Sequence, residues 1–198
     1  MNYLAHAYFS FNHPQVLVGN MISDFVKGKQ QYDFPNDIQK GIQLHRIIDN
    51  FTDTHTVISK AKNLFKPEIG LYAGAFVDIA FDYFLANDAT VFSTDENLLD
   101  FTQNVYEVLN LHQQCLPEKF NTILPHMQQH NWLYNYKQTI GIEKSFAGLT
   151  RRAKYINTSH ESFTVFTSNI NALQECYDEY IIDLKEFSND AFLQLFSK

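Results

Sequence analysis

The sequence predicts an all-α protein, folded as a single-domain helical bundle, and three observations indicate this. Apolar residues recur mostly at intervals of three and four, the spacing that lines one face of a helix. Alternating runs bounded by tight hairpin turns, which would indicate strands, are almost absent. The chain has 198 residues, 45% of them hydrophobic and 15% aromatic, and no Gly/Ser/Pro-rich linker divides it, so one packed core is expected.

Five helices are expected in the first part of the chain. Pro14 and Pro35 fit the first turn of a helix, where the missing N–H of proline costs nothing, and an Asn, Asp or His lies near each cap position. Apolar periodicity extends the helices from these starts. The predicted ranges are 2–11, 14–28, 35–55, 55–65 and 69–87.

Four more helices and a short tail helix are expected after a polar loop at 88–97. Their predicted ranges are 96–113, 118–131, 143–152 and 160–187, and a second loop is expected at 153–160. The most apolar stretch of the chain is 70–87, but Asp78 and Asp82 lie in its middle. Carboxylates are costly in lipid, so this stretch is predicted to be a core helix and no membrane association is expected.

Composition restricts the class of protein. The formal net charge of −7 argues against nonspecific nucleic-acid binding, which needs a basic surface. Cys115 and Cys176 form neither a C-x-x-C pair nor a disulfide framework, which fits a reducing compartment. The N-terminal MNYLAHAYFSF has neither the basic region nor the cleavage site of a signal peptide. A cytoplasmic protein is therefore expected.

The segment GIQLHRIIDNFTDTH carries ionisable side chains beside core residues. His45, Asp49 and Asp53 follow one another at four-residue steps, so they project from one side of a helix. Ile47, Ile48 and Phe51, between them, are expected to be buried. The same step separates Asp78 from Asp82.

Several of these ionisable groups lie in apolar sequence, as do His6 in NYLAHAYF and Asp24 in GNMISDFVKG. Buried carboxylates are normally paired or bound to a metal, and basic residues are few here. A divalent metal would balance the excess negative charge. Histidine with several carboxylates suits Mn, Mg, Fe or Zn, and an oxygen-rich set favours Mn or Mg. The candidate ligands are His6, Asp24, His45, Asp49, Asp78 and Asp82.

Each candidate also has a purely structural interpretation. His6 fits a hydrogen-bonded core histidine, and Asp53 fits a solvated or capping residue. Asp78 and Asp82 could form salt bridges with Arg151 or Arg152. Other chemistries are not supported, because the chain contains no G-x-S-x-G, no Walker A loop, no G-x-G-x-x-G and no H-E-x-x-H.

Five sequence blocks follow one another in an order that resembles the bacterial acyl carrier protein phosphodiesterase family. They run from residue 1 to about residue 155 and read MNYLAH, GNMISDFVKG, GIQLHRIIDNFTD, FVDIAFDYFLA and GLTRRAK. The resemblance implies an all-helical fold distantly related to HD-type metal phosphohydrolases. It also implies removal of the 4'-phosphopantetheine arm from holo acyl carrier protein, with a divalent cation, typically manganese.

The resemblance assigns roles to particular residues. Asp24 matches the essential aspartate of the family's G-N-x-x-x-D-F block, and the other matching residues are His45, Arg46, Asp49, Asp53, Asp78, Asp82, Arg151 and Arg152. The chain departs from the family at three points. No His is followed directly by Asp, Tyr83 stands where a His is expected, and Lys154 stands where an Arg is expected.

These residues suggest a mechanism for phosphodiester hydrolysis. The candidate ligands would hold one metal or two, and Asp24 or Asp49 would orient the attacking water as a general base. Arg46, Arg151 and Arg152 would bind phosphate oxygens. An acidic carrier protein also requires a basic rim on this acidic chain, for which the candidates are Lys27, Lys29, Lys40, Arg46, Arg151, Arg152 and Lys154.

Two other functions fit the same residues. An HD-like phosphohydrolase acting on nucleotides or another small phosphodiester would share the metal site but would not need the basic rim. A non-enzymatic helical binding protein would use the carboxylates only in salt bridges.

Overall fold

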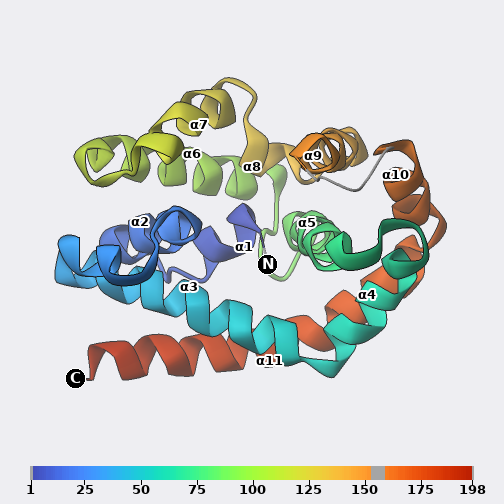
Figure 1. Ribbon diagram of the computed structural model, residues 1–198, viewed down its shortest axis with the longest axis horizontal. Helices are drawn as coiled ribbons and strands as arrows, with labels where there is room; N and C mark the ends of the chain where they lie inside the picture. The colour runs from blue at the N-terminus through green and yellow to red at the C-terminus, as the bar shows by residue number, and fades with distance from the viewer. Residues whose placement is uncertain (1, 153–158, 198) are drawn as a thin grey trace.

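The computed structural model describes residues 2–152 and 159–197, and within these ranges all regular structure is helical (Figure 1). The α-helices are α1 Tyr3–Tyr8, α2 Pro14–Ile22, α3 Asn36–Thr54, α4 Thr56–Ile69, α5 Ala73–Ala86, α6 Asp95–Leu111, α7 Glu118–Gln129, α8 Trp132–Asn135, α9 Thr139–Arg152, α10 Ser159–Ser168 and α11 Ile170–Phe196. The short 3₁₀ helices are η1 Ser23–Phe25, η2 Gly28–Asp33, η3 Gly70–Tyr72 and η4 Gln113–Cys115.

The predicted helix at 14–28 ends at Ile22, six residues early, and Asp24 lies in the 3₁₀ turn η1. Val26 and Lys27 have extended backbones, and Gly28 has a φ of +54°, a left-handed conformation that glycine adopts at little cost. The chain therefore leaves the helix here, and the turn carries Asp24 toward α3.

The helix predicted at 160–187 is two helices, and the expected tail helix is the end of the second. Asn169 separates α10 from α11, and its side chain donates to the carbonyl of Val165 at 2.8 Å. Such local side-chain bonds compete with the helical ladder and favour a break. The short α8 was not predicted, α9 begins four residues earlier than expected, and most of the predicted loop at 153–160 lies outside the described residues.

Two glycines allow α2 and α3 to cross at close range. A Cβ on Gly19 would lie 2.1 Å from the carbonyl oxygen of Ile38, and one on Gly41 would lie 2.2 Å from that of Val16. Any larger residue at either position would separate the two backbones. This close crossing brings Asn20, the next residue after Gly19, against the part of α3 that carries His45.

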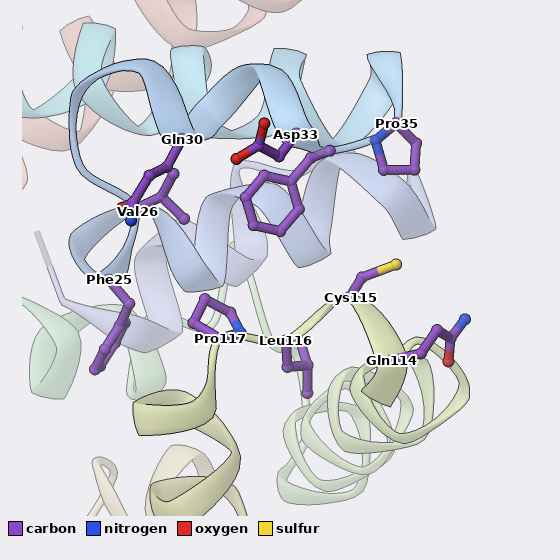
Figure 2. Close-up of a pocket in the computed structure, with 10 residues that line it drawn as sticks. Phe25, Val26, Gln30, Asp33, Pro35, Gln114, Cys115, Leu116 and Pro117 are labelled. Carbon is purple, nitrogen blue, oxygen red and sulfur yellow. The ribbon is translucent and has the colours of Figure 1, made fainter.

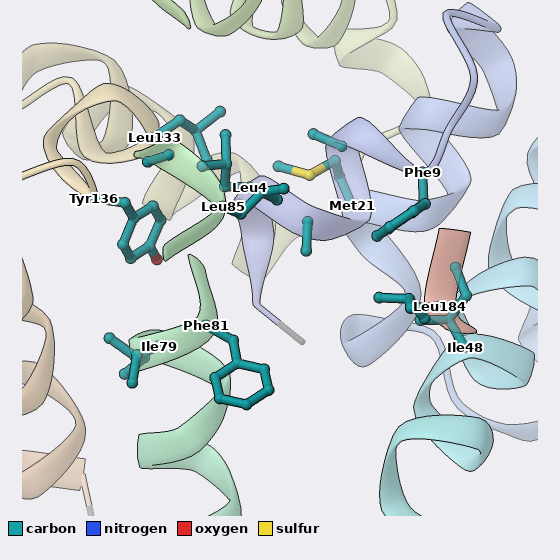
Figure 3. Packing of buried hydrophobic residues seen from close by; sticks show 14 of the residues in the cluster. Leu4, Phe9, Met21, Ile48, Ile79, Phe81, Leu85, Leu133, Tyr136 and Leu184 are labelled. Carbon is teal, nitrogen blue, oxygen red and sulfur yellow. The ribbon is translucent and has the colours of Figure 1, made fainter. Parts of the chain in front are cut away.

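The core of the described residues is a cluster of buried apolar side chains that extends from Leu4 in α1 to Ala191 in α11. Figure 3 shows a part of it, in which α1, α2, α5 and α8 contribute side chains around Leu4 and Leu85. The short α1 therefore lies inside the bundle, where a polar residue requires a partner.

One helical stretch, Thr56–Ala86, is long enough to cross a membrane and contains an 18-residue window with a mean hydropathy of 1.4. In the folded chain 61% of that window is buried inside the protein. The stretch is also divided into α4 and α5, which pack against each other. Its composition is therefore explained by the core, as the sequence predicted for 70–87.

Candidate functional site

Two histidines from different helices form the centre of the candidate site. His6 in α1 and His45 in α3 stack with their ring centroids 3.8 Å apart and an interplanar angle of 13°. Both residues are buried, with exposed fractions of 3% and 6%. The parallel stack places the two Nε2 atoms side by side.

The Nδ1 atoms of both rings face oxygen atoms of Asn20 in α2. His6 Nδ1 lies 3.0 Å from the side-chain Oδ1, and His45 Nδ1 lies 2.7 Å from the backbone carbonyl oxygen. The Nε2 atoms on the other edge are buried, and within the described part of the chain neither makes a well-aligned hydrogen bond; carboxylate oxygens lie within ion-pair distance of both. Buried polar atoms without partners are uncommon and call for an explanation such as a bound ion.

Two carboxylates face these Nε2 atoms. Asp49 lies one turn after His45 on α3, and its two oxygens lie 3.2 Å from His6 Nε2 and 3.1 Å from His45 Nε2. Asp24 Oδ1, from η1, lies 3.4 Å from His45 Nε2. The Asp24 side chain is 74% exposed and that of Asp49 is 40% exposed, so the group opens to solvent on the carboxylate side.

The two histidines have opposite pKa shifts because their surroundings differ. Burial, together with the nearby His45, lowers the pKa of His6 to about 4. Burial also lowers the pKa of His45, but the carboxylates of Asp24 and Asp49 outweigh it and raise the pKa to about 9. At neutral pH the metal-free pair therefore holds one positive charge.

The same contacts keep both carboxylates ionised. His45 lowers the pKa of Asp24, and burial opposes this only in part. Burial raises the pKa of Asp49, but the neighbouring His45 and His6 outweigh it and hold the pKa below its usual range. Neutral imidazole nitrogens and ionised carboxylates are the forms that bind metals, so displacement of one proton from His45 would complete the donor set.

The donor atoms fit a divalent metal. One ligand atom from each of His6, His45 and Asp49 lies within 4.8 Å of the other two. Metal–ligand distances of about 2.0–2.2 Å allow ligand atoms up to about 4.4 Å apart, so a small adjustment would close this group around an ion. Asp24 lies next to the group and could supply a fourth ligand or contact bound water.

Asp82, a predicted ligand, lies apart from this group and has a structural role. It is fully buried on α5, and its carboxylate accepts backbone N–H bonds from Leu4 at 2.8 Å, Ala5 at 3.3 Å and Asn2 at 3.4 Å. These are the unpaired donors at the start of α1, so Asp82 caps that helix from another element. It thereby helps to hold His6 in place.

The other two aspartates differ in exposure. Asp53 is exposed and forms an ion pair with Lys62 at 2.8 Å, which agrees with its interpretation as a solvated residue. Asp78 is half-buried on α5. Burial raises the pKa of Tyr180, and the negative charges of Asp78, Asp49 and Asp53 add to this.

The predicted phosphate-binding arginines have different environments. Arg46 donates to the carbonyl of Val26 at 2.9 Å and to the side chain of Gln31 at 2.7 Å, so it fastens the loop after Asp24 to α3. Arg151 is exposed near the end of α9. The side chain of Arg152 and all of Lys154 lie outside the described part of the chain.

A groove begins at the residues that follow Asp24. Its walls come from the η1–η2 segment and from the turn between α6 and α7 (Figure 2). Most of its lining side chains are apolar and three are polar, and the lining residues are Phe25, Val26, Gln30, Asp33, Phe34, Pro35, Gln114, Cys115, Leu116 and Pro117.

The family model described as acyl carrier protein phosphodiesterase matches residues 1–184. The chain belongs to this family. Similar proteins with the same description include one from Photorhabdus laumondii, 29% identical over 82% of each chain, and one from Yersinia pestis, 26% identical over 89% of this chain and 92% of the relative. One from Escherichia coli is 28% identical over 88% of this chain and 90% of the relative. No solved structure matches the chain.

The structure thus brings His6, Asp24, His45 and Asp49 together, from α1, η1 and α3. Sequence reasoning did not identify Asn20 as part of this acyl carrier protein phosphodiesterase site. The available signal was its position, since a buried Asn directly after a glycine on a short apolar helix must satisfy its amide within the core.

Proposed function

We propose that the chain is a metal-dependent phosphodiesterase that hydrolyses 4'-phosphopantetheine from the serine of holo acyl carrier protein and leaves the apo form. The observation that supports this most strongly is the pair of buried imidazoles whose Nε2 atoms both face Asp49, with Asp24 beside them. Membership of the acyl carrier protein phosphodiesterase family supports the choice of substrate.

The residues of this group have separate roles. His6, His45 and Asp49 would hold the ion, which when bound would polarise a phosphate oxygen and activate water. Asp24 is ionised and is the most exposed of the four, so it is placed to accept the proton of the attacking water. Arg46 holds Val26 and so fixes the turn that carries Asp24, while Arg151 and Arg152 are proposed to bind phosphate oxygens.

Several finer properties belong to the same proposal. Manganese is the proposed metal, with Mg, Fe or Zn as the other choices compatible with two imidazoles and carboxylates. A cytoplasmic location and a role in fatty acid and lipid metabolism follow from a carrier-protein substrate. A distant relationship to HD-type phosphohydrolases is proposed from the helical fold and the histidine–aspartate set, although the set is assembled from three separate segments.

Mass spectrometry of holo acyl carrier protein incubated with the enzyme and Mn²⁺ tests the proposed reaction. We expect loss of the prosthetic arm, and Asp24→Ala should slow it at least about 100-fold, the contribution of a positioned base. Asp53→Ala is the matched control, since it removes an exposed aspartate that is paired with Lys62 instead. If the prosthetic arm stays on the carrier protein while nucleotides or other small phosphodiesters are cleaved, the HD-like alternative is favoured. If neither the carrier protein nor any small phosphodiester is cleaved, a binding protein is favoured.

The groove next to Asp24 is the proposed place for the pantetheine arm, whose amides and methyl groups match its mixture of polar and apolar side chains. Gln114→Trp, at an exposed lining position, should raise KM for the holo carrier protein several-fold, because the indole would fill the groove. Gln113→Trp changes an exposed neighbour that does not line the groove and should leave KM unchanged. Equal effects of the two variants would exclude the groove.

A further inference from the structure

Asn20 contacts both histidines of the candidate metal centre while lying completely buried in α2. Its Oδ1 lies 3.0 Å from His6 Nδ1, and its backbone oxygen lies 2.7 Å from His45 Nδ1. Its Nδ2 donates to the carbonyl of His6 at 2.8 Å and to Ser10 Oγ at 3.2 Å. One residue therefore binds both rings on the edge opposite the Nε2 atoms.

The partners of Asn20 determine which way its amide points. The carbonyl oxygen of His6 can only accept, so it must face the NH₂ group, and Oδ1 is left to face His6 Nδ1. An amide oxygen also only accepts, so His6 Nδ1 must carry a proton. The neutral ring then has its lone pair on Nε2, 3.2 Å from the carboxylate oxygen of Asp49, so two acceptor atoms face each other and a cation between them would remove the repulsion.

The same logic applies to His45 through the main chain. Its Nδ1 faces the backbone carbonyl of Asn20, which can only accept, so this nitrogen also carries a proton. The close crossing of α2 and α3 at Gly19 and Gly41 makes this contact possible. Both rings therefore depend on the same residue for orientation, one on its side chain and one on its carbonyl.

We propose that Asn20 is the positioning residue of the metal centre, which holds His6 and His45 as Nδ1–H rings so that both present Nε2 to one ion. The inference rests on the proposed metal site. Histidine ligands in proteins usually donate their second ring N–H to such an acceptor, and loss of the acceptor weakens metal binding about 10–100-fold.

The test uses the full chain labelled with ¹⁵N-histidine. In the metal-free wild type, NMR should report His6 as the Nδ1–H tautomer. Asn20→Leu removes the side-chain acceptor, so His6 should lose this preference, while His45 should keep its Nδ1 proton because its acceptor is a backbone carbonyl. The Kd for Mn²⁺, measured by electron paramagnetic resonance, should rise about 10–100-fold.

Ser10→Ala is the matched control. It removes two buried hydrogen bonds of the same network, to the carbonyl of His6 and from Asn20 Nδ2, but leaves the contact between Asn20 and His6 Nδ1 intact, so both the tautomer and the Kd for Mn²⁺ should stay as in the wild type. Equal weakening by Ser10→Ala and Asn20→Leu would reduce Asn20 to a packing residue and overturn the proposal.

The wild-type spectrum decides the matter even if Asn20→Leu does not fold, because an Nε2–H tautomer of His6 would overturn the proposal directly. A wild type that binds no Mn²⁺ would remove the ion from the site and with it the proposed positioning role. A site that binds Mn²⁺ without cleaving the carrier protein would instead leave the role of Asn20 intact and count against the proposed reaction.

Discussion

Asp82 places a fully buried carboxylate at the start of α1, where it accepts three backbone N–H bonds. Burial raises its pKa to about 7, against the N–H groups that favour the ionised form. Because the folded-state pKa lies above the ordinary value of 3.8, ionisation costs stability in the folded state. The stability that protonated Asp82 contributes to the folded state is fully present below pH 3.8 and is lost as the pH rises through about 7.

Asp82→Asn removes this titration but keeps the shape of the side chain. The variant should be less stable than the wild type, because its NH₂ group cannot accept an N–H bond from α1. The difference in free energy of unfolding between the wild type and Asp82→Asn should narrow by about 2–4 kcal/mol from about pH 4 to about pH 8, because at the higher pH the wild type carries the buried charge. Urea unfolding in the presence of a chelator measures it, with Asp53→Asn as the exposed control.

Four of the six metal ligands predicted from the sequence lie close together at the candidate site, whereas the contacts of Asp82 and Arg46 were not predicted. His6, Asp24, His45 and Asp49 could be found because each is an unusual ionisable group in apolar sequence. The partners of Asp82 and Arg46 are backbone atoms of other segments, at Leu4 and Val26. A residue-type pattern carries no information about such partners, so these roles required the fold.

At the scale of the elements, the crossing of α2 and α3 is the contact on which the site depends. A Cβ at Gly41 would lie 2.2 Å from the carbonyl oxygen of Val16 and 2.9 Å from the Cα of Gly19. Both are backbone atoms, so the two helices would have to move apart. The carbonyl of Asn20 would then draw away from His45.

Gly41→Ala should therefore lower the free energy of unfolding by at least about 2 kcal/mol, the cost of overpacking with a backbone shift. It should also weaken Mn²⁺ binding. Gly148→Ala is the matched control in α9, where the added Cβ makes only an ordinary contact of 3.7 Å with Arg151, and alanine there should stabilise the helix by about 0.5–1 kcal/mol. Thermal unfolding of both variants measures the two changes in stability. Equal stabilities of Gly41→Ala and Gly148→Ala would contradict the close crossing of α2 and α3.

Helix positions were predicted from periodicity where the apolar pattern was long, as at 35–55, which is α3 in the structure. The errors lie where a polar side chain or a glycine decides the ending. The helix predicted at 14–28 ends at Ile22 and continues only as a 3₁₀ turn before the extended backbone at Val26, and the helix predicted at 160–187 breaks at Asn169. Periodicity does not report such local competition, so these endings could not be read from the pattern.

At the scale of the whole molecule, an acidic enzyme is proposed to meet an acidic carrier protein. The chain has a formal net charge of −7, so a favourable encounter requires local positive charge near the site. Lys27 and Lys29 are exposed in the segment that follows Asp24. Lys40, in contrast, is occupied by an ion pair with Asp37 at 3.0 Å and lies over the ring of Phe196.

Reversing the charge of Lys27 and Lys29 together, each to Glu, should reduce kcat/KM for the holo carrier protein about tenfold or more at low salt, mainly through KM. The effect should shrink at high salt, because screening weakens long-range attraction. Lys66→Glu, at an exposed position on α4, is the control and should change little. A loss of activity that is independent of salt would point to damage in the turn instead of lost attraction.

The helical class followed from composition and periodicity, and family likeness indicated the same architecture. The assembly of the site across α1, η1 and α3 did not follow from either. It depends on a turn that ends α2, on a glycine crossing and on a carboxylate from α5 that holds α1 in place. These are long-range contacts between segments that local sequence rules treat separately.

The four site residues differ in exposure, and among the described residues the centre opens to solvent on its carboxylate side. His6 and His45 are buried in the bundle, while the Asp24 side chain is 74% exposed. The phosphodiester and the water that attacks it are therefore expected to reach the site from the solvent-exposed side, where Asp24 lies. The released arm and the carrier protein have to depart by the same route, so the order in which they leave becomes part of the enzyme's turnover.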